Sequence, residues 1–198
     1  MRYTGPKDRL SRREGFDLFN KGAKLTRLNV TPGQHGPKGQ TRQPSQYGRQ
    51  LREKQKVKRM YGLTESKFSL YMEEALRTRG NTGEKLITLL ENRLDNVVFR
   101  LGFTSTRPQA RQLVTHRHVL VNGKRLNIPS YQVKVSDTIT LSGKSMEIPN
   151  VKKLIANKEA LVPSWLKRKG PAGVVGKFNI EDVKEPISTS DIIEFYSR

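Results

Sequence analysis

The sequence contains no cysteine, no long apolar run and too few acidic residues to balance its basic ones. Without cysteine the chain can form neither a disulfide framework nor a thiolate zinc site, and this permits a reducing compartment. No stretch approaches the roughly 18 consecutive apolar residues of a membrane span. The first residues, MRYTGPKDRLSRREG, lack the apolar core of a signal peptide. These absences predict a soluble, unprocessed protein and favour the cytoplasm.

Positive charge is the strongest compositional signal. The 198 residues include 38 Lys and Arg against 18 Asp and Glu, a formal net charge of +20 at pH 7. Such an excess implies a polyanionic partner, most often nucleic acid. Residues 1–62 hold 16 basic and 4 acidic residues and residues 63–170 hold 19 and 9, whereas residues 171–198 hold 3 and 5. The last segment is therefore not expected to be an RNA-binding arm.

Residues 1–44 are rich in Gly, Pro and basic residues and carry few apolar ones, so this segment is not expected to fold alone. It leads into TPGQHGPKGQTRQPS, whose Pro-Gly and Gly-Pro pairs break a helix and leave backbone amides able to meet an anion. Composition alone favours a flexible linker over an anion-binding loop.

The next segment predicts a strongly basic helix over residues 45–62, with Ser45 as its N-cap and Gly62 as its stop signal. Helical spacing places Arg52, Lys56 and Arg59 on one face, and puts Arg49 two turns from Lys56. Only one acidic residue, Glu53, relieves their repulsion, which favours a phosphate-facing helix. A second helix ending at Gly80 is scaffold with these core residues: Phe68, Tyr71, Met72, Ala75 and Leu76.

The stretch TGEKLITLLENRLDNVVFRLGF has the clearest apolar periodicity and predicts one helix that closes at Gly102. Thr106 and Gln109 then form a capping box around Pro108, so another helix is expected from about Arg107. Arg107, Arg111 and Thr115 recur every four residues on its exposed face. Its N-terminal amides add a natural phosphate site.

After Thr115 the apolar period changes from 3.6 to 2, which predicts a small sheet. VLVNGKRL predicts a hairpin because Asn122-Gly123 suits the two positive φ values of a type I′ turn. YQVKV and TITL are expected to form two more short strands. Residues 146–170 are expected to add one strand and one helix.

His116 and His118 raise the question of a metal or catalytic site. Zinc needs three or four convergent ligands, and only three histidines and scattered carboxylates are present, so we expect no metal or other cofactor. No nucleophile elbow or phosphate-binding glycine loop occurs, and nothing indicates an enzyme. Two interpretations stay open and are compatible: the histidines mark a helix end, or they line an RNA-binding surface with Arg107, Arg111 and Thr115.

The same residues carry a family resemblance. RLDNVVFRLGF followed by STRPQARQLVTHRHVLVNGKRLNIPSYQVKVSDTI resembles the S-four RNA-binding module. RYTGPKDRLSRREG, PGQHGPK, QLREKQKVKRMYG and IIEFYSR resemble the bacterial-type family of small-subunit ribosomal protein four, so the resemblance covers nearly the whole chain. Many members bind zinc through four cysteines, but Asp8 and Ser11 stand where the first pair would be. The chain therefore resembles the zinc-free branch, which implies that residues 1–44 are ordered by RNA contact and docking.

The resemblance implies an α+β fold in four parts. Residues 1–44 form an extended basic N-terminal arm. Residues 45–90 form a small helical domain, completed by residues from about 180 to 198. Residues 91–153 form an inserted α-L type RNA-binding module with a small, mainly antiparallel sheet. Residues 154–198 return to the helical domain, where IIEFY completes the core.

The resemblance also implies a structural constituent of the small ribosomal subunit, not an enzyme, that binds the 5′ domain of small-subunit rRNA and nucleates assembly. It contributes to translational accuracy and to the region where mRNA enters, beside ribosomal protein five and other small-subunit proteins. No membrane partner or homo-oligomer is expected. A cytoplasmic ribosome is the expected location, with an organellar origin left open. Two alternatives remain: an RNA-modifying enzyme that uses an S-four module, and a regulator that binds free mRNA or DNA.

The candidate RNA-binding residues come from these stretches. Arg107 and Arg111 are expected to meet phosphate, and the two histidines are secondary candidates. The full set is Arg2, Tyr3, Arg12, Arg13, Gln34, His35, Lys38, Tyr47, Arg49, Arg52, Lys56, Arg59, Arg107, Arg111, Gln112, Thr115, His116, His118, Asn122 and Lys124.

Overall fold

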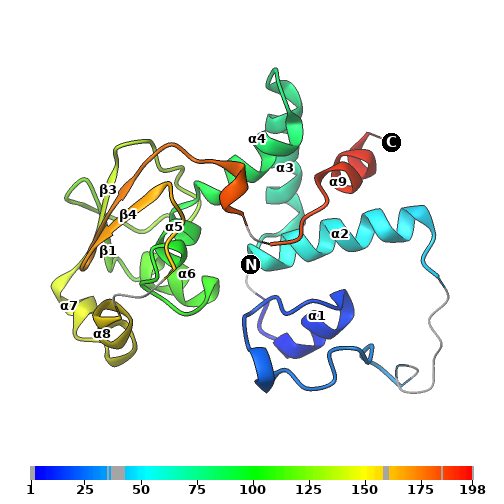
Figure 1. Cartoon of the computed structure of the whole chain (residues 1–198), viewed down its shortest axis with the longest axis horizontal. Coiled ribbons are helices and arrows are strands. Elements are labelled where there is room, and N and C mark those ends of the chain that lie inside the picture. Colours follow the sequence, from blue (N-terminus) through cyan, green and yellow to red (C-terminus); the bar gives the residue numbers. More distant parts are fainter. Residues whose placement is uncertain (1–2, 35, 37–42, 158–160, 184, 198) are drawn as a thin grey trace. The chain divides into compact units, whose positions relative to one another are not determined.

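The computed structural model describes residues 3–34, 36, 43–157, 161–183 and 185–197 (Figure 1). The chain forms two compact units, one of residues 1–83 with 186–198 and one of residues 84–185. The class is α+β with a small antiparallel sheet, as expected. Within the described ranges, no helix is both long and apolar enough to cross a membrane.

The first unit begins with a helix that the sequence did not predict, α1 (Lys7–Glu14). Pro6 precedes it and Gly15 ends it at φ 63°, a combination typical of helix boundaries. The Ser11 hydroxyl, 1% exposed as a residue, accepts a hydrogen bond from the Leu18 amide at 3.4 Å. A short 3₁₀ turn, η1 (Gly22–Lys24), follows. The segment therefore contains one regular helix, and the expectation that it does not fold alone stays a prediction.

Helix α2 (Gln46–Met60) has the expected limits, whereas α3 (Glu65–Arg77) ends three residues before the expected stop at Gly80. In α2 the Ser45 hydroxyl accepts from the Gly48 amide at 3.2 Å, and Gly62 lies at φ 63° after its end. In α3 Phe68 and Ala75 are fully buried, but Leu76 is 49% exposed. The prediction that Leu76 belongs to the core is wrong because it lies at the margin of the buried stripe.

The C-terminal helix α9 (Thr189–Tyr196) packs on α2 within the first unit. Ile192 of α9 is fully buried, and the Phe195 ring stacks on Tyr47 with ring centroids 5.6 Å apart. The ammonium of Lys54 in α2 lies 4.1 Å from the centroid of Phe195 and donates to Glu65 at 2.7 Å. Apolar contact and the cation–π contact of Lys54 with Phe195 therefore both attach α9 to α2.

The helix expected over residues 82–102 is interrupted, which corrects the prediction. It forms α4 (Thr82–Glu91) and α5 (Leu94–Arg100), with Arg93 in an extended conformation between them. At the break, the Leu94 amide donates to the Tyr131 carbonyl and the Val133 amide donates to the Asn92 carbonyl, both at 2.9 Å. Backbone bonds to a segment far along the chain replace those of a continuous helix.

Helix α6 (Arg107–Thr115) begins where expected, with Thr106 as N-cap and Pro108 in the first turn. The capping box is wrong, because the Thr106 side chain makes no capping hydrogen bond. The Gln109 side chain instead accepts from the Ser105 hydroxyl at 2.7 Å. Two further helices follow the third strand, α7 (Gly143–Met146) and α8 (Pro149–Ala156).

The second unit contains a five-stranded antiparallel sheet in the order β2-β1-β3-β5-β4. The hairpin of β1 (Val119–Val121) and β2 (Lys124–Leu126) is confirmed, with Asn122 at φ 50° and Gly123 at φ 80°. The strand over YQVKV is wrong: only Gln132 forms an isolated bridge, to Arg93. The remaining elements are β3 (Thr138–Leu141), β4 (Leu166–Lys169), β5 (Ala172–Val175) and the 3₁₀ turn η2 (Ile180–Asp182).

One face of this sheet forms the main core of the second unit together with α5, α6 and α8. Alternation along β1 and β3 directs Val119, Val121, Ile139 and Leu141 into it. Helix α6 contributes its apolar side, so its opposite side is available for other contacts. The other residues of this core include Leu94, Val97, Val98, Leu101, Phe103, Ala110, Leu113, Val114, Val133, Val151, Trp165, Leu166 and Val175.

Candidate nucleic-acid interface

Arg107 lies at the start of α6, but its side chain is only 10% exposed. Its guanidinium donates to the Asn96 side chain at 2.9 Å and to Glu185 at 2.8 Å, and it lies 4.7 Å from the centroid of the Phe99 ring. The prediction that Arg107 occupies the exposed face of the helix is therefore wrong. Its expected contact with phosphate therefore competes with these internal partners.

A second arginine, Arg100 of α5, shares the Glu185 carboxylate. It also forms a two-pronged pair with the buried Glu91, at 2.7 and 2.9 Å. Asn96 joins the two halves of this cluster, since its amide donates to Glu91 at 2.8 Å and its oxygen accepts from Arg107. Burial alone would raise the pKa of Glu185, but Arg100 and Arg107 lower this pKa to about 2. This cluster holds α4, α5, α6 and the segment near residue 185 together.

The rest of the predicted α6 surface is exposed as expected. Gln112, Thr115 and His116 are exposed, and the Arg111 side chain is 35% exposed. Arg111 lies 4.0 Å from Asp95, a wide separation for an ion pair. The Thr115 hydroxyl donates back to its own helix, to the carbonyls of Arg111 and Gln112 at 3.0 Å. Of the two arginines predicted on this face, Arg107 and Arg111, Arg111 is thus the more exposed to solvent.

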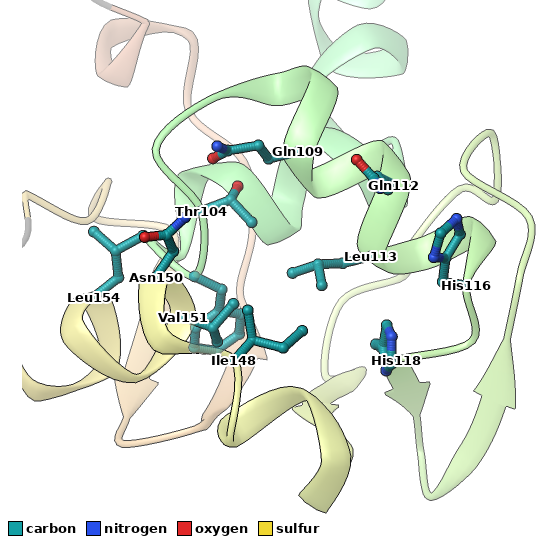
Figure 2. Close-up of a pocket in the computed structure, with 11 residues that line it drawn as sticks. Thr104, Gln109, Gln112, Leu113, His116, His118, Ile148, Asn150, Val151 and Leu154 are labelled. Atoms are coloured by element: carbon teal, nitrogen blue, oxygen red, sulfur yellow. The ribbon is translucent and has the colours of Figure 1, made fainter.

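His116 and His118 mark the end of α6, which confirms the simpler of the two interpretations. His116 is the C-cap residue, and Arg117 turns the chain with φ 61°. The two imidazole centroids lie 6.3 Å apart at 45°, with His116 exposed and His118 half-buried (Figure 2). The carbonyl of His118 accepts from the Ser142 amide at 2.9 Å. Their contact with RNA remains a prediction.

The β1–β2 hairpin contains one side chain that stabilises its turn and two cations that contact solvent. The Asn122 amide group donates to Asp137 at 2.8 Å, and its oxygen accepts from the Thr138 backbone at 2.9 Å. This side chain therefore fixes the turn to β3. Lys124 and its neighbour Arg125 are exposed. The hairpin presents these two cations to solvent.

The basic face predicted on α2 is turned toward acidic side chains of its own unit. Arg52 and Arg59 both donate to one oxygen of Glu14 in α1, and Lys56 pairs with Glu53 at 3.2 Å. The side chains of Arg59 and Lys56 are 20% and 12% exposed, whereas that of Arg52 is 41% exposed. Arg59 and Lys56 are therefore used to attach α1 and to pair within α2, and their contact with phosphate remains a prediction.

Glu14 is the counterpart of these arginines, and its side chain is 1% exposed. Burial raises the pKa of Glu14 above 4.5, although Arg59 and Arg52 oppose the shift. Burial likewise lowers the pKa of Arg59. The second carboxylate oxygen of Glu14, Oε2, is buried and has no hydrogen bond among the described residues. The ion pair that docks α1 on α2 is therefore incompletely satisfied.

Other predicted residues of the first unit differ in exposure. Arg12 donates to the carbonyls of Val30 and Thr31, at 2.8 and 3.3 Å, and so orders the segment after α1. Exposed candidates are Tyr3, Arg13, Gln34, Tyr47 and Arg49. Arg2, His35 and Lys38 lie outside the described residues, as does half of the TPGQHGPKGQ stretch.

The structure adds exposed cations that the sequence analysis did not select. Arg117 lies between the two histidines and Arg125 follows Lys124 in the hairpin. Lys152 and Lys153 lie on α8. The excess positive charge of their segment was visible in the sequence, but composition does not tell exposed cations from paired ones. Across the ranges that the structure describes, no group of three His, Cys, Asp or Glu residues could hold a metal ion.

Two family models match consecutive parts of the chain, from residue 2 to residue 139. Residues 2–91 match the ribosomal protein S4/S9 N-terminal domain, and residues 92–139 match the S4 domain. The boundary between the two matches coincides with the interruption between α4 and α5. The S4 domain match contains α5, α6 and the hairpin with its exposed cations.

Curated relatives are similar over the entire chain. The chain is 49% identical over 208 residues to the small ribosomal subunit protein uS4 of Cupriavidus pinatubonensis. It is 48% identical over 206 residues to uS4 of Polaromonas naphthalenivorans, and 48% identical over 208 residues to uS4A of Clostridium botulinum. Each alignment covers 100% of this chain and 99% of the relative.

Proposed function

Because the chain belongs to the bacterial-type uS4 family of small ribosomal subunit proteins, we propose that it is a structural, rRNA-binding constituent of the small ribosomal subunit. The observation that carries this proposal is the match over the full length, at 44 to 49% identity, to proteins with that name. The net charge of +20 supports it, since a polyanionic partner is needed to neutralise so many cations.

The exposed cations are the part of the protein that meets RNA. In the second unit they include Arg117, just after α6, and Lys124 and Arg125 in the hairpin, and the Arg111 side chain of α6 is 35% exposed. In the first unit Arg13 and Arg49 are exposed. Arg can bind phosphate through two parallel hydrogen bonds, and Lys binds it as a point charge. The paired arginines, Arg107 among them, act by holding these surfaces in shape.

The finer parts of the proposal concern partners and role. The bound RNA is the 5′ domain of small-subunit rRNA, and binding it early nucleates assembly. In the completed subunit the protein lies beside ribosomal protein five, close to the channel through which mRNA enters, and contributes to accuracy. Its place is a cytoplasmic ribosome. Family membership supports these statements as a group, and the exposed basic surfaces are compatible with a long RNA footprint.

An RNA-modifying enzyme is not favoured, because the family is one of structural ribosomal proteins. A modifying enzyme would need a separate catalytic domain, and the two family matches already account for residues 2–139. A regulator of free mRNA uses the same chemistry of phosphate binding, so the choice of RNA separates it from the proposal.

The test is binding of the purified full chain to a transcript of the 5′ domain, compared with an equally long transcript from another rRNA domain. We expect nanomolar affinity for the first at physiological salt and a steep salt dependence, with a slope of about 0.7 to 0.9 for each phosphate neutralised. Sedimentation of tagged protein with small subunits is the matching measurement in cells. Equal affinity for both transcripts, with no tagged protein in the subunit fractions, would contradict the proposal.

A further inference from the structure

A pocket of about 290 Å³ opens between α6 and α8 in the second unit (Figure 2). Branched apolar side chains form much of its wall, with Leu113 from α6 and Ile148, Val151 and Leu154 from the start and body of α8. Leu113 and Val151 also belong to the core. We call this cavity the α6–α8 pocket. Its lining is rigid on the core side because α6 and α8 both pack there.

The polar part of the α6–α8 pocket consists of amides, imidazoles and the hydroxyl of Thr104, which donates to the Thr106 carbonyl at 3.2 Å. Gln109, Gln112 and His116 lie three and four residues apart, on one face of α6. Asn150 lies across from them on α8, and His118 follows the end of α6 (Figure 2). Ser105 donates to the Gln109 oxygen, which leaves the NH₂ group of that amide as a donor. The amides of Gln112 and Asn150 are exposed and make no hydrogen bond to another described residue.

No Asp, Glu, Lys or Arg lines the α6–α8 pocket, although the protein carries a net charge of +20. An uncharged lining gives a phosphate or a carboxylate nothing to pair with once it leaves water. Cations lie next to the pocket instead: Arg117 is exposed between the two histidines, and Lys153 is exposed three residues after Asn150 on α8. The arrangement suits a ligand with a neutral, flat, partly apolar body and negative charge on either side of it.

We propose that the α6–α8 pocket receives one unpaired nucleobase of the bound RNA. The faces of the base contact the apolar wall and the His116 ring, as bases in single-stranded loops stack on aromatic side chains. Its edge bonds to the amides of Gln112 and Asn150, which offer both donors and acceptors. The flanking phosphates lie toward Arg117 and Lys153. This inference rests on the proposed binding of RNA.

An apolar side chain of a neighbouring protein is the other occupant with a suitable body. It would fill the apolar wall but leave the three amides of the rim facing an atom that neither donates nor accepts. Covering a polar group without a partner is unfavourable by an amount comparable to the hydrogen bond it loses. The composition of the rim therefore favours a base over an apolar side chain.

The experiment uses the full chain bound to the 5′-domain transcript, probed in two ways. Hydroxyl radicals report the protected backbone, and dimethyl sulfate together with a carbodiimide reports the accessible edges of all four unpaired bases. Wild type is compared with Gln112→Ala/Asn150→Ala, with His116→Ala and with His116→Phe, which keeps a ring for stacking. Asn127→Ala is the matched control, because it removes an exposed amide of the same unit outside the pocket. Fluorescence of the buried Trp165 verifies that each variant is folded.

We expect one unpaired base that wild type protects to become reactive with the double variant and with His116→Ala, while the backbone footprint stays. Affinity should fall between about fivefold and about 150-fold, the range that stacking of one base provides. His116→Phe should restore most of the affinity, and Asn127→Ala should behave as wild type.

A wild-type backbone footprint with no base that responds to the pocket variants would overturn this inference and leave the proposed function intact. The same holds if the variants change only the association with another small-subunit protein, because the pocket would then accept a protein side chain. Absence of any wild-type footprint on the transcript would contradict the proposed function itself.

Discussion

Glu185 in the second unit and Glu14 in the first are each bonded to two arginines, but only Glu185 is bonded through both of its oxygens. Its Oε2 accepts from Arg100 and its Oε1 from Arg107, each at 2.8 Å. Against the effect of burial, these two guanidinium groups lower the pKa of Glu185 to about 2. The ionised carboxylate is therefore the form that this site stabilises.

Glu14 also has two arginines as partners, but its pKa is shifted in the opposite direction. Arg52 and Arg59 both donate to Oε1, while Oε2 is buried without a hydrogen bond among the described residues. Burial therefore outweighs the two arginines, and the pKa of Glu14 lies above 4.5. The comparison shows that two neighbouring charges do not suffice to stabilise a buried carboxylate. Each desolvated oxygen must also have a donor.

The largest expected effect is the loss of Arg100. Arg100→Ala leaves the buried Glu91 and the mostly buried Glu185 with fewer donors, so the free energy of unfolding should fall by about 3–5 kcal/mol. Urea unfolding followed by Trp165 fluorescence measures it, since this single tryptophan is buried in the core of the second unit. The control Arg125→Ala removes an exposed arginine of the same unit and should cost less than about 1 kcal/mol. Equal losses for the two variants would contradict the account.

The second effect is a dependence of the free energy of unfolding on pH, caused by the titration of Glu185. Because its folded pKa is lowered from 4.5 to about 2, its stabilisation is present above pH 4.5 and is lost as the pH falls toward 2. At about 1.4 kcal/mol for each pH unit, the loss can reach about 3 kcal/mol. Glu185→Gln should remove this part of the slope in Trp165 unfolding curves. An unchanged slope in the variant would show that Glu185 titrates normally.

The pH dependence caused by Glu14 should have the opposite sign and be smaller. Its folded pKa is raised, so docking of α1 is favoured below pH 4.5 and weakens as the pH rises through the folded pKa. Amide hydrogen exchange of Lys7–Glu14 measures the opening of α1, corrected for intrinsic exchange rates. Glu14→Gln should change the opening free energy at pH 7 by about 1–2 kcal/mol and flatten its pH dependence. A pH dependence like that of Glu185 would refute the comparison.

Local signals predicted much of the fold. Ser45 and Gly62 bound α2 because a capping hydroxyl and a left-handed glycine act within one turn of the chain. Asn122 and Gly123 fix the hairpin for the same reason. The same kind of signal, Pro6 before α1 and Gly15 after it, was present but was outweighed by the low apolar content of the segment.

The failures involve partners far along the chain. Arg107 looked exposed because helical spacing says nothing of Glu185, which lies 78 residues later. Arg59 looked free because Glu14 lies 45 residues earlier, in a segment that was not expected to fold alone. The interruption at Arg93 depends on backbone bonds to residues 129–133. The sequence therefore located the basic segments, while the fold decides which of their cations remain exposed.

The central claim is that exposed arginines bind RNA and buried ones hold the fold, and salt dependence tests it most directly. Binding of the full chain to the 5′-domain transcript is measured at several salt concentrations for Arg111→Ala, Arg117→Ala and Arg107→Gln. Each of the first two should lower the salt slope by about 0.7 to 0.9, because each removes one phosphate contact. Arg107→Gln should lower the Trp165 unfolding midpoint and leave the slope unchanged. The account is contradicted if Arg107→Gln lowers the slope as Arg111→Ala does while the unfolding midpoint stays the same.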